Sequence, residues 1–260
     1  MYMKNKSVLL GILVVLICAC SSYEDKETPA DYTVETVSEA PSWYVDYSGN
    51  ESRPDWQEPN PAEYENWTIM LVQLEDALKP FTTGEDLLAL FVDGELRGLT
   101  SPAVSQGNKD DEEDKGTFVL KAYGNEADQN MVNLTLSYYC SQLKQTFSRT
   151  VQTTYDMDKV YGLDEDLIPQ FTLGSVKYPV VTQLMITAEN LSPINVTFGS
   201  GDMLAAFVGN ECRGILSLND QTTIAPYHQL TVLGRQEDEA YTLKYYNAAT
   251  QRIYTLSKSF

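Results

Sequence analysis

Residues 87–98 decide the fold of this chain and read Leu87-Leu88-Ala89-Leu90-Phe91-Val92-Asp93-Gly94-Glu95-Leu96-Arg97-Gly98. The segment returns as Met203-Leu204-Ala205-Ala206-Phe207-Val208-Gly209-Asn210-Glu211-Cys212-Arg213-Gly214. Each copy predicts two strands around a two-residue turn, because Asp-Gly and Gly-Asn accept the positive φ angles of tight hairpins. A hairpin that occurs twice indicates a duplicated protein built from sheets.

Pairing the strands directly across the turn predicts which side chains share a face. Phe91 then opposes Leu96, and Ala89 opposes Gly98. Small residues beside a large ring allow another layer to approach closely, so this face is predicted to meet the core. The corresponding residues of the second copy are Phe207, Cys212, Ala205 and Gly214.

The other face of the hairpin carries Glu95 and Arg97, with Leu90 opposite the arginine. Glu211 and Arg213 repeat the pair in the second copy. One interpretation is a ligand site. The other is a partly solvated ion pair that fixes the register and contributes about 0–1 kcal/mol, and the recurrence of the pair favours this architectural role.

The rest of the chain predicts an all-β protein of two tandem β-sandwiches, immunoglobulin-like in broad terms, over residues 66–152 and 179–260 with a linker over 153–178. Each copy contains about six short alternating or apolar segments bounded by turn residues. Expected strands of the first copy are 67–74, 87–92, 95–100, 117–123, 131–140 and 145–151. Those of the second are 180–188, 203–208, 211–217, 228–233, 240–246 and 252–256. Further matches between the copies are Gly124 with Gly234, Glu126 with Gln236, and Tyr138 with Tyr245.

The N-terminus resembles a bacterial lipoprotein signal peptide over residues 1–19. Lys4 and Lys6 precede an apolar run that ends Leu16-Ile17-Cys18-Ala19-Cys20. This pattern resembles a lipobox, which implies acylation of Cys20. The acidic residues that follow resemble the surface-export signal of Bacteroidota lipoproteins and imply an outer-membrane anchor facing the cell exterior.

Residues 20–65 are predicted to form a flexible tether followed by an aromatic-rich arm. Trp43, Tyr44, Tyr47 and Trp56 are the candidate ligand contacts, because aromatic rings can stack on sugar rings. The alternative is that the arm packs onto the first sandwich.

A net charge of −19 argues against nucleic acid as a partner, since such a surface repels phosphates. The single histidine, His228, excludes multi-histidine metal sites and leaves no evident catalytic set, so we expect no cofactor, no metal and no enzymatic activity. The acidic run 108–114 lacks the spacing of a calcium loop and is predicted to be solvated. Cys140 and Cys212 are expected to be buried free thiols, with a disulfide as the alternative.

The second hairpin gives a family resemblance. Residues 205–214 read AAFVGNECRG, and similar forms recur in Bacteroidales surface lipoproteins of mostly unknown function. The first copy departs from this pattern at Leu90 and Leu96, where the second has Ala206 and Cys212. The resemblance implies a location and a fold class but no reaction.

Three functions remain open. The first is a non-catalytic surface lipoprotein that binds a glycan or a peptide, or that serves an outer-membrane nutrient-uptake complex. The second is a structural or adhesive subunit that uses strand exchange. The third is a glycoside hydrolase with a carboxylate pair.

Acylation of Cys20 can be tested by metabolic labelling. Cells that express the chain should incorporate radiolabelled palmitate into it, and Cys20→Ala should abolish the label because only that thiol receives the lipid. Cys18→Ala is the matched control and should keep the label. A labelled Cys20→Ala chain would contradict the prediction.

Overall fold

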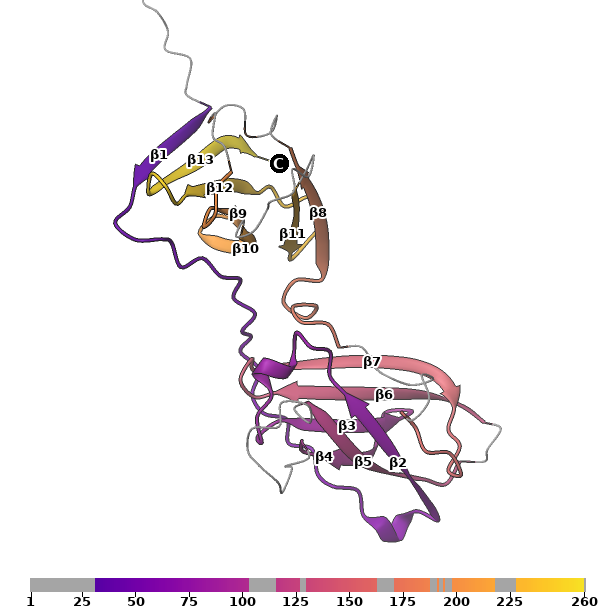
Figure 1. Cartoon of the computed structure of the whole chain (residues 1–260). Helices are drawn as coiled ribbons and strands as arrows, with labels where there is room; N and C mark the ends of the chain where they lie inside the picture. Colours follow the sequence, from indigo (N-terminus) through magenta and orange to yellow (C-terminus); the bar gives the residue numbers. More distant parts are fainter. Residues whose placement is uncertain are drawn as a thin grey trace, which may run out of the picture. The chain divides into compact units, whose positions relative to one another are not determined.

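The computed structural model describes residues 31–102, 116–126, 130–162, 171–187, 191, 194, 198–217 and 228–259. The signal peptide, Cys20 and the acidic run 108–114 lie outside these residues. The described chain confirms the prediction of an all-β sandwich fold. Figure 1 shows two groups of strands, β2 to β7 in one and β8 to β13 with β1 in the other, which we call the first and the second module.

The strands of the first module are β2 (Asn66–Gln73), β3 (Leu87–Val92), β4 (Glu95–Thr100), β5 (Thr117–Gly124), β6 (Met131–Cys140) and β7 (Gln145–Thr154). Those of the second are β8 (Val180–Ile186), β9 (Met203–Val208), β10 (Glu211–Ser217), β11 (His228–Gly234), β12 (Thr242–Asn247) and β13 (Arg252–Ser259), joined by β1 (Tyr32–Thr36). Short 3₁₀ helices are η1 (Pro61–Glu63) and η2 (Lys79–Phe81).

Both modules have the same sheet topology. The larger sheet of the first has the order β4-β3-β6-β7 and faces the pair β2-β5. The second repeats this as β10-β9-β12-β13 facing β8-β11, with β1 added beyond β13. Each pair of sheets encloses its own cluster of buried apolar side chains. Six strands in the same order and pairing are what duplication of a whole unit produces.

The hairpin turns adopt the expected left-handed conformations. Asp93 and Gly94 have φ angles of 48° and 89°, as a turn with two positive φ angles requires. In the second hairpin Gly209 alone has a positive φ, 59°. A type II′ turn has a positive φ angle and a preference for glycine at its first central position. Both dipeptides therefore close their hairpins because they accept positive φ angles, as predicted.

The predicted register holds only next to the turn. Phe91 opposes Leu96 as expected, but Leu90 opposes Gly98 and not Arg97. A β-bulge inserts Arg97 as an extra residue in β4, which shifts every later pair by one. The second hairpin shifts at the same place, with Phe207 opposite Cys212 and Ala206 opposite Gly214. The recurring bulge re-aims one arginine in each module.

The predicted core face is buried in the second hairpin, where Ala205, Phe207 and Cys212 form a small apolar cluster under the arm, but this face does not meet the main core in the first. Leu88, Leu90 and Val92 lie between the two sheets and are buried in the first core. Phe91 lies outside that cluster and packs edge-on against Trp56, with ring centroids 5.8 Å apart. The aliphatic face presents three branched side chains to the opposite sheet, whereas the Phe91 face mixes a ring with small residues. The layer that covers Phe91 on this face is the arm.

Gly98 shows why a small residue is needed beside the bulge. A Cβ atom there would lie 2.6 Å from the carbonyl oxygen of Lys121 on β5. A Cβ atom on Gly214 would lie closer still to the carbonyl oxygen of Thr231 on β11. These glycines therefore allow the larger sheet to meet the smaller one at a corner of each sandwich.

The sequence prediction placed residues 32–36 in a flexible tether, and this was wrong. They form β1, which pairs antiparallel with β13 from Tyr32 opposite Leu256 to Thr36 opposite Arg252. The Tyr32 ring lies 5.8 Å from that of Tyr254, between centroids. The side chains of these five residues are mostly exposed, so they give little hydrophobic pattern in the sequence. Backbone pairing with the edge strand β13 is what orders them. In the described part of the chain, no helix has the length and apolar character needed to cross a membrane.

A buried carboxylate occupies the same place in both modules. Asp86 accepts hydrogen bonds from Tyr138 Oη at 2.7 Å and from the Ser141 N–H at 2.9 Å. The equivalent set is Asp202 with Tyr245 Oη, the Ala248 N–H and the Gly199 N–H. Burial, together with the neighbouring carboxylate and thiol, raises the pKa of Tyr138, so this hydroxyl remains a donor. The carboxylate thereby fixes the loop before β3 to the turn between β6 and β7.

Removing this carboxylate should destabilise the module that contains it. Asp86→Ala and Asp202→Ala should each lower the free energy of unfolding by about 2–4 kcal/mol, because each leaves buried donors without an acceptor. Guanidinium titration followed by tyrosine and tryptophan fluorescence measures this. Asp55→Ala, at an exposed position, should change the value by less than about 0.5 kcal/mol. Equal effects at Asp55 and Asp86 would contradict the assigned role.

Candidate functional site

Arg97 is the centre of the repeat signature in the first module. Its side chain is 9% exposed, and Nη2 lies 2.7 Å from Glu126 and 3.2 Å from Glu95. The ring of Tyr64 covers the guanidinium, with its centroid 4.9 Å from Cζ. The Tyr64 hydroxyl donates to Glu95 at 2.9 Å. One bulged residue thus joins β4, the loop after β5 and the entry to β2.

Arg213 repeats this arrangement in the second module with deeper burial. Its side chain is 2% exposed and lies 3.2 Å from both Glu211 and Glu239. The Tyr178 ring takes the place of Tyr64, 4.8 Å from the guanidinium carbon. The sequence comparison aligned Gln236 with Glu126, but Glu239 has that role. Both carboxylates also accept the N–H of the residue after Gly124 or Gly234, from Asn125 and Arg235.

The predicted partial solvation is found at the carboxylates, since the side chains of Glu95 and Glu211 are 61% and 35% exposed, whereas the arginines are buried. A guanidinium between two carboxylates and under a tyrosine ring has no open face for a ligand. Such a group contributes little net free energy while intact, but removing it leaves the largely buried carboxylate of Glu126 or Glu239 without its cation. We interpret the Glu95–Arg97 and Glu211–Arg213 pairs as architectural.

The aromatic arm uses most of its rings for packing. Trp56 covers Phe91 of the first module, and Trp43 covers Phe207 of the second with centroids 5.6 Å apart. The equivalent phenylalanines of the two repeats thus receive one tryptophan each from the same arm. The arm packs onto the first sandwich, as the alternative interpretation expected, and it also packs onto the second. Both rings therefore contribute to packing through edge-on contacts.

Tyr47 is also built into the structure. Its ring packs edge-on against Tyr178 at 6.5 Å, and its carbonyl accepts a hydrogen bond from Gln145. Next to it, Lys177 donates to Asp46 at 2.9 Å and holds the pKa of that carboxyl below its usual value. Tyr44 is the one candidate of the arm that stays open, with 70% of its surface exposed.

An aromatic cluster on the outer face of β2 and β5 was missed by the sequence analysis. Trp67 is 55% exposed and opposes Tyr123. The Lys121 ammonium lies 4.6 Å from the Trp67 ring centroid and 5.0 Å from that of Tyr123. Ile69 and Val119 extend the apolar character of this face, which we call the Trp67 face. The sequence shows an aromatic residue in each strand, Trp67 and Tyr123. Only the pairing of β2 with β5, which are distant in the sequence, brings the two rings together.

The equivalent face of the second module is polar. Gln183 on β8 accepts hydrogen bonds from Gln229 and Thr231 on β11, both at 3.0 Å. Its exposed apolar residues, Val181 and Met185, carry no ring. The aromatic cluster is thus a property of the first module alone and not part of the duplicated framework. In the first module this face adjoins the arginine signature, because Tyr64 covers Arg97 and its ring also stacks on that of Tyr123, with centroids 5.6 Å apart.

Metal and thiol chemistry find little support in the described residues. No group of three or more histidine, cysteine or acidic side chains there could hold a metal ion. Cys140 and Cys212 are free and buried, and burial raises the pKa of both thiols. His228 begins β11 and packs edge-on against Phe198 at 4.7 Å.

Comparison with known proteins gives no match: no family model, no curated protein and no solved structure is similar to this chain.

The architectural role of the arginines can be separated from ligand binding by stability. Arg97→Ala and Arg213→Ala should each lower the free energy of unfolding by about 3–5 kcal/mol, because each leaves a largely buried carboxylate, Glu126 or Glu239, without its guanidinium partner. Arg53 is the matched control, since its pair with Glu85 is exposed at 3.8 Å. Arg53→Ala should cost less than about 0.5 kcal/mol in a guanidinium titration. Stable Arg97→Ala and Arg213→Ala variants would refute the architectural role.

Proposed function

We propose that this chain is a non-catalytic lipoprotein of the outer membrane that faces the cell exterior and binds a glycan on the Trp67 face. The lipobox at Cys20 and the acidic residues after it support the location. The observation that carries the binding role is an indole that is 55% exposed beside a second ring and an ammonium group.

The chemistry of the Trp67 face suits sugars. An exposed indole gives up the favourable free energy of burying a large apolar ring. Such a ring on the open face of a sheet therefore indicates a binding surface. The apolar face of a pyranose can lie on the indole, while Lys121 donates hydrogen bonds to hydroxyl or carboxylate oxygens. The strands β2 and β5 hold these side chains on a rigid pair, which lowers the ordering cost of binding.

A non-catalytic role fits the composition. Acyl transfer needs a nucleophile, a base and a group that orients the base. His228 packs against Phe198 and is the single imidazole of the chain. A binding lipoprotein could serve an outer-membrane nutrient-uptake complex by holding a glycan near the transporter.

The test is a glycan array followed by calorimetry on the purified chain. Trp67→Ala should weaken binding of the best glycan at least tenfold, because the stacking surface is lost. Tyr44→Ala is the matched control, since it removes another exposed ring and should leave the affinity unchanged. Both variants should keep the wild-type unfolding midpoint, as both side chains are open to solvent.

Three results would contradict the proposal. One is the absence of binding to any arrayed glycan. Another is equal affinity of Trp67→Ala and the wild type. The third is binding that follows Tyr44, which would return the site to the arm.

A further inference from the structure

The two modules differ at one edge of their larger sheets. In the second module β13 is covered by β1. In the first module the equivalent strand, β7, ends its sheet, since the order is β4-β3-β6-β7. Across the described residues, no backbone hydrogen bond joins Thr146–Thr154 of β7 to a segment other than β6. An edge with free backbone donors and acceptors is a template for another strand.

The second module shows how such a strand is seated. Tyr138 opposes Phe147 on β7, and Tyr245 opposes Tyr254 on β13, which makes Phe147 equivalent to Tyr254. Counting along the strands then makes Arg149 equivalent to Leu256, the residue opposite Tyr32 of β1. A strand added to β7 in the register of β1 would therefore place its first side chain opposite Arg149.

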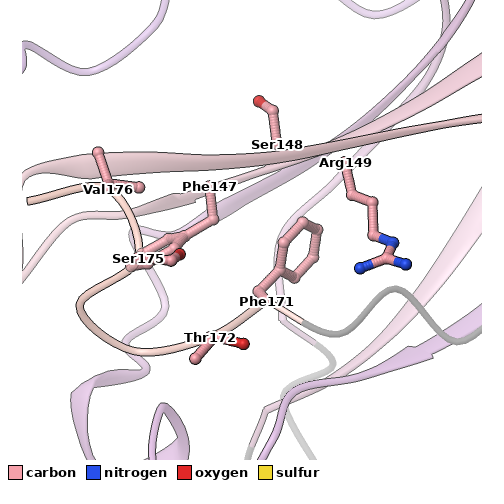
Figure 2. Close-up of a pocket in the computed structure, with 7 residues that line it drawn as sticks. All are labelled: Phe147, Ser148, Arg149, Phe171, Thr172, Ser175 and Val176. Atoms are coloured by element: carbon pink, nitrogen blue, oxygen red, sulfur yellow. The ribbon is translucent and has the colours of Figure 1, made fainter. Parts of the chain in front are cut away.

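A cavity lies where that side chain would point. Figure 2 shows Phe147 and Arg149 on one side of β7 and Ser148 on the other, with the segment 171–176 facing the first two. The cavity has a volume of about 360 Å³ and is lined by Phe147, Ser148, Arg149, Phe171, Thr172, Ser175 and Val176. In the second module the ring of Tyr32 packs against Tyr254, the equivalent of Phe147. The cavity thus offers a seat for an aromatic side chain of an added strand.

The charge around β7 favours an acidic strand. Residues 131–154 contain no Asp or Glu, although the whole chain has 37, and they include Lys144 and Arg149. Residues 242–259, which form β12 and β13, likewise contain no acid. That hairpin is covered by β1, which carries Glu35 and follows Asp31. The same complementarity is available at β7.

We propose that the edge of β7 accepts an extended acidic segment of a separate polypeptide, antiparallel to β7, with an aromatic side chain opposite Arg149. Backbone hydrogen bonds supply the affinity, and the cavity and Arg149 supply the selectivity. A second copy of this chain is disfavoured as the donor, because moving its β1 to β7 would uncover its own β13. This interface is distinct from the Trp67 face and does not depend on glycan binding.

The probe is a fluorescent peptide with the sequence of residues 30–38, Ala-Asp-Tyr-Thr-Val-Glu-Thr-Val-Ser, titrated against the full chain in detergent by anisotropy. Saturable binding is expected, and replacing the tyrosine of the peptide by alanine should weaken it at least tenfold. Arg149→Glu should weaken binding at least tenfold through charge repulsion. Thr172→Trp should also weaken it by filling the cavity, and its exposed position preserves the fold.

Arg252→Glu is the matched control, because Arg252 lies on β13 opposite Thr36. It should leave peptide binding unchanged. Loss of binding in Arg252→Glu but not in Arg149→Glu would mean that the peptide displaces β1, which overturns the proposal. No binding at millimolar peptide would also overturn it. A concentration-dependent dimer that Arg149→Glu abolishes would overturn the separate partner in favour of a second copy.

Discussion

A buried guanidinium between two carboxylates sets the geometry of each module. Arg97 and Arg213 are the extra residues of β-bulges and have no partner residue on the opposite strand. Their side chains contact Glu126 and Glu239, respectively. Each holds a hairpin strand, the loop after β5 or β11, and a tyrosine at the entry to β2 or β8. A buried guanidinium is tolerated only when carboxylates and hydrogen-bond acceptors lie at the right positions around it. This requirement fixes how the segments that carry those groups are arranged.

The duplicated framework leaves the surfaces free to differ. Both modules keep the bulged arginine, the buried aspartate of Asp86 or Asp202, and the glycine at the sheet corner. Yet the outer face of the smaller sheet is aromatic in one module and amide-rich in the other. One larger sheet ends in β7 while the other is extended by β1. Binding functions are therefore expected where the copies diverge, since the shared features serve folding.

Much of the fold was predictable because the hairpin signal is local. The turn dipeptides, the strand alternation and the internal repeat placed β3, β4, β6, β9 and β10 with correct bounds. The register beyond Phe91 failed because a bulge has no separate sequence signature here. The core face of the first hairpin failed for a related reason: Phe91 was judged by its neighbours in the hairpin, whereas Trp56, distant in sequence, covers it. The Trp67 face was missed because β2 and β5 meet only after folding.

By itself, the sequence determined that the protein is built from two copies of a sheet module, that its charge is strongly negative, and that its start resembles a lipoprotein signal. These properties depend on residues close together in the chain. Only the tertiary structure decided that the arginines are buried, that the tryptophans of the arm cover equivalent phenylalanines, and that β7 is an edge strand within the described part of the chain. Burial and edge pairing depend on contacts between segments that are distant in the sequence. No local sequence pattern specifies which segment will pack against a given strand or side chain.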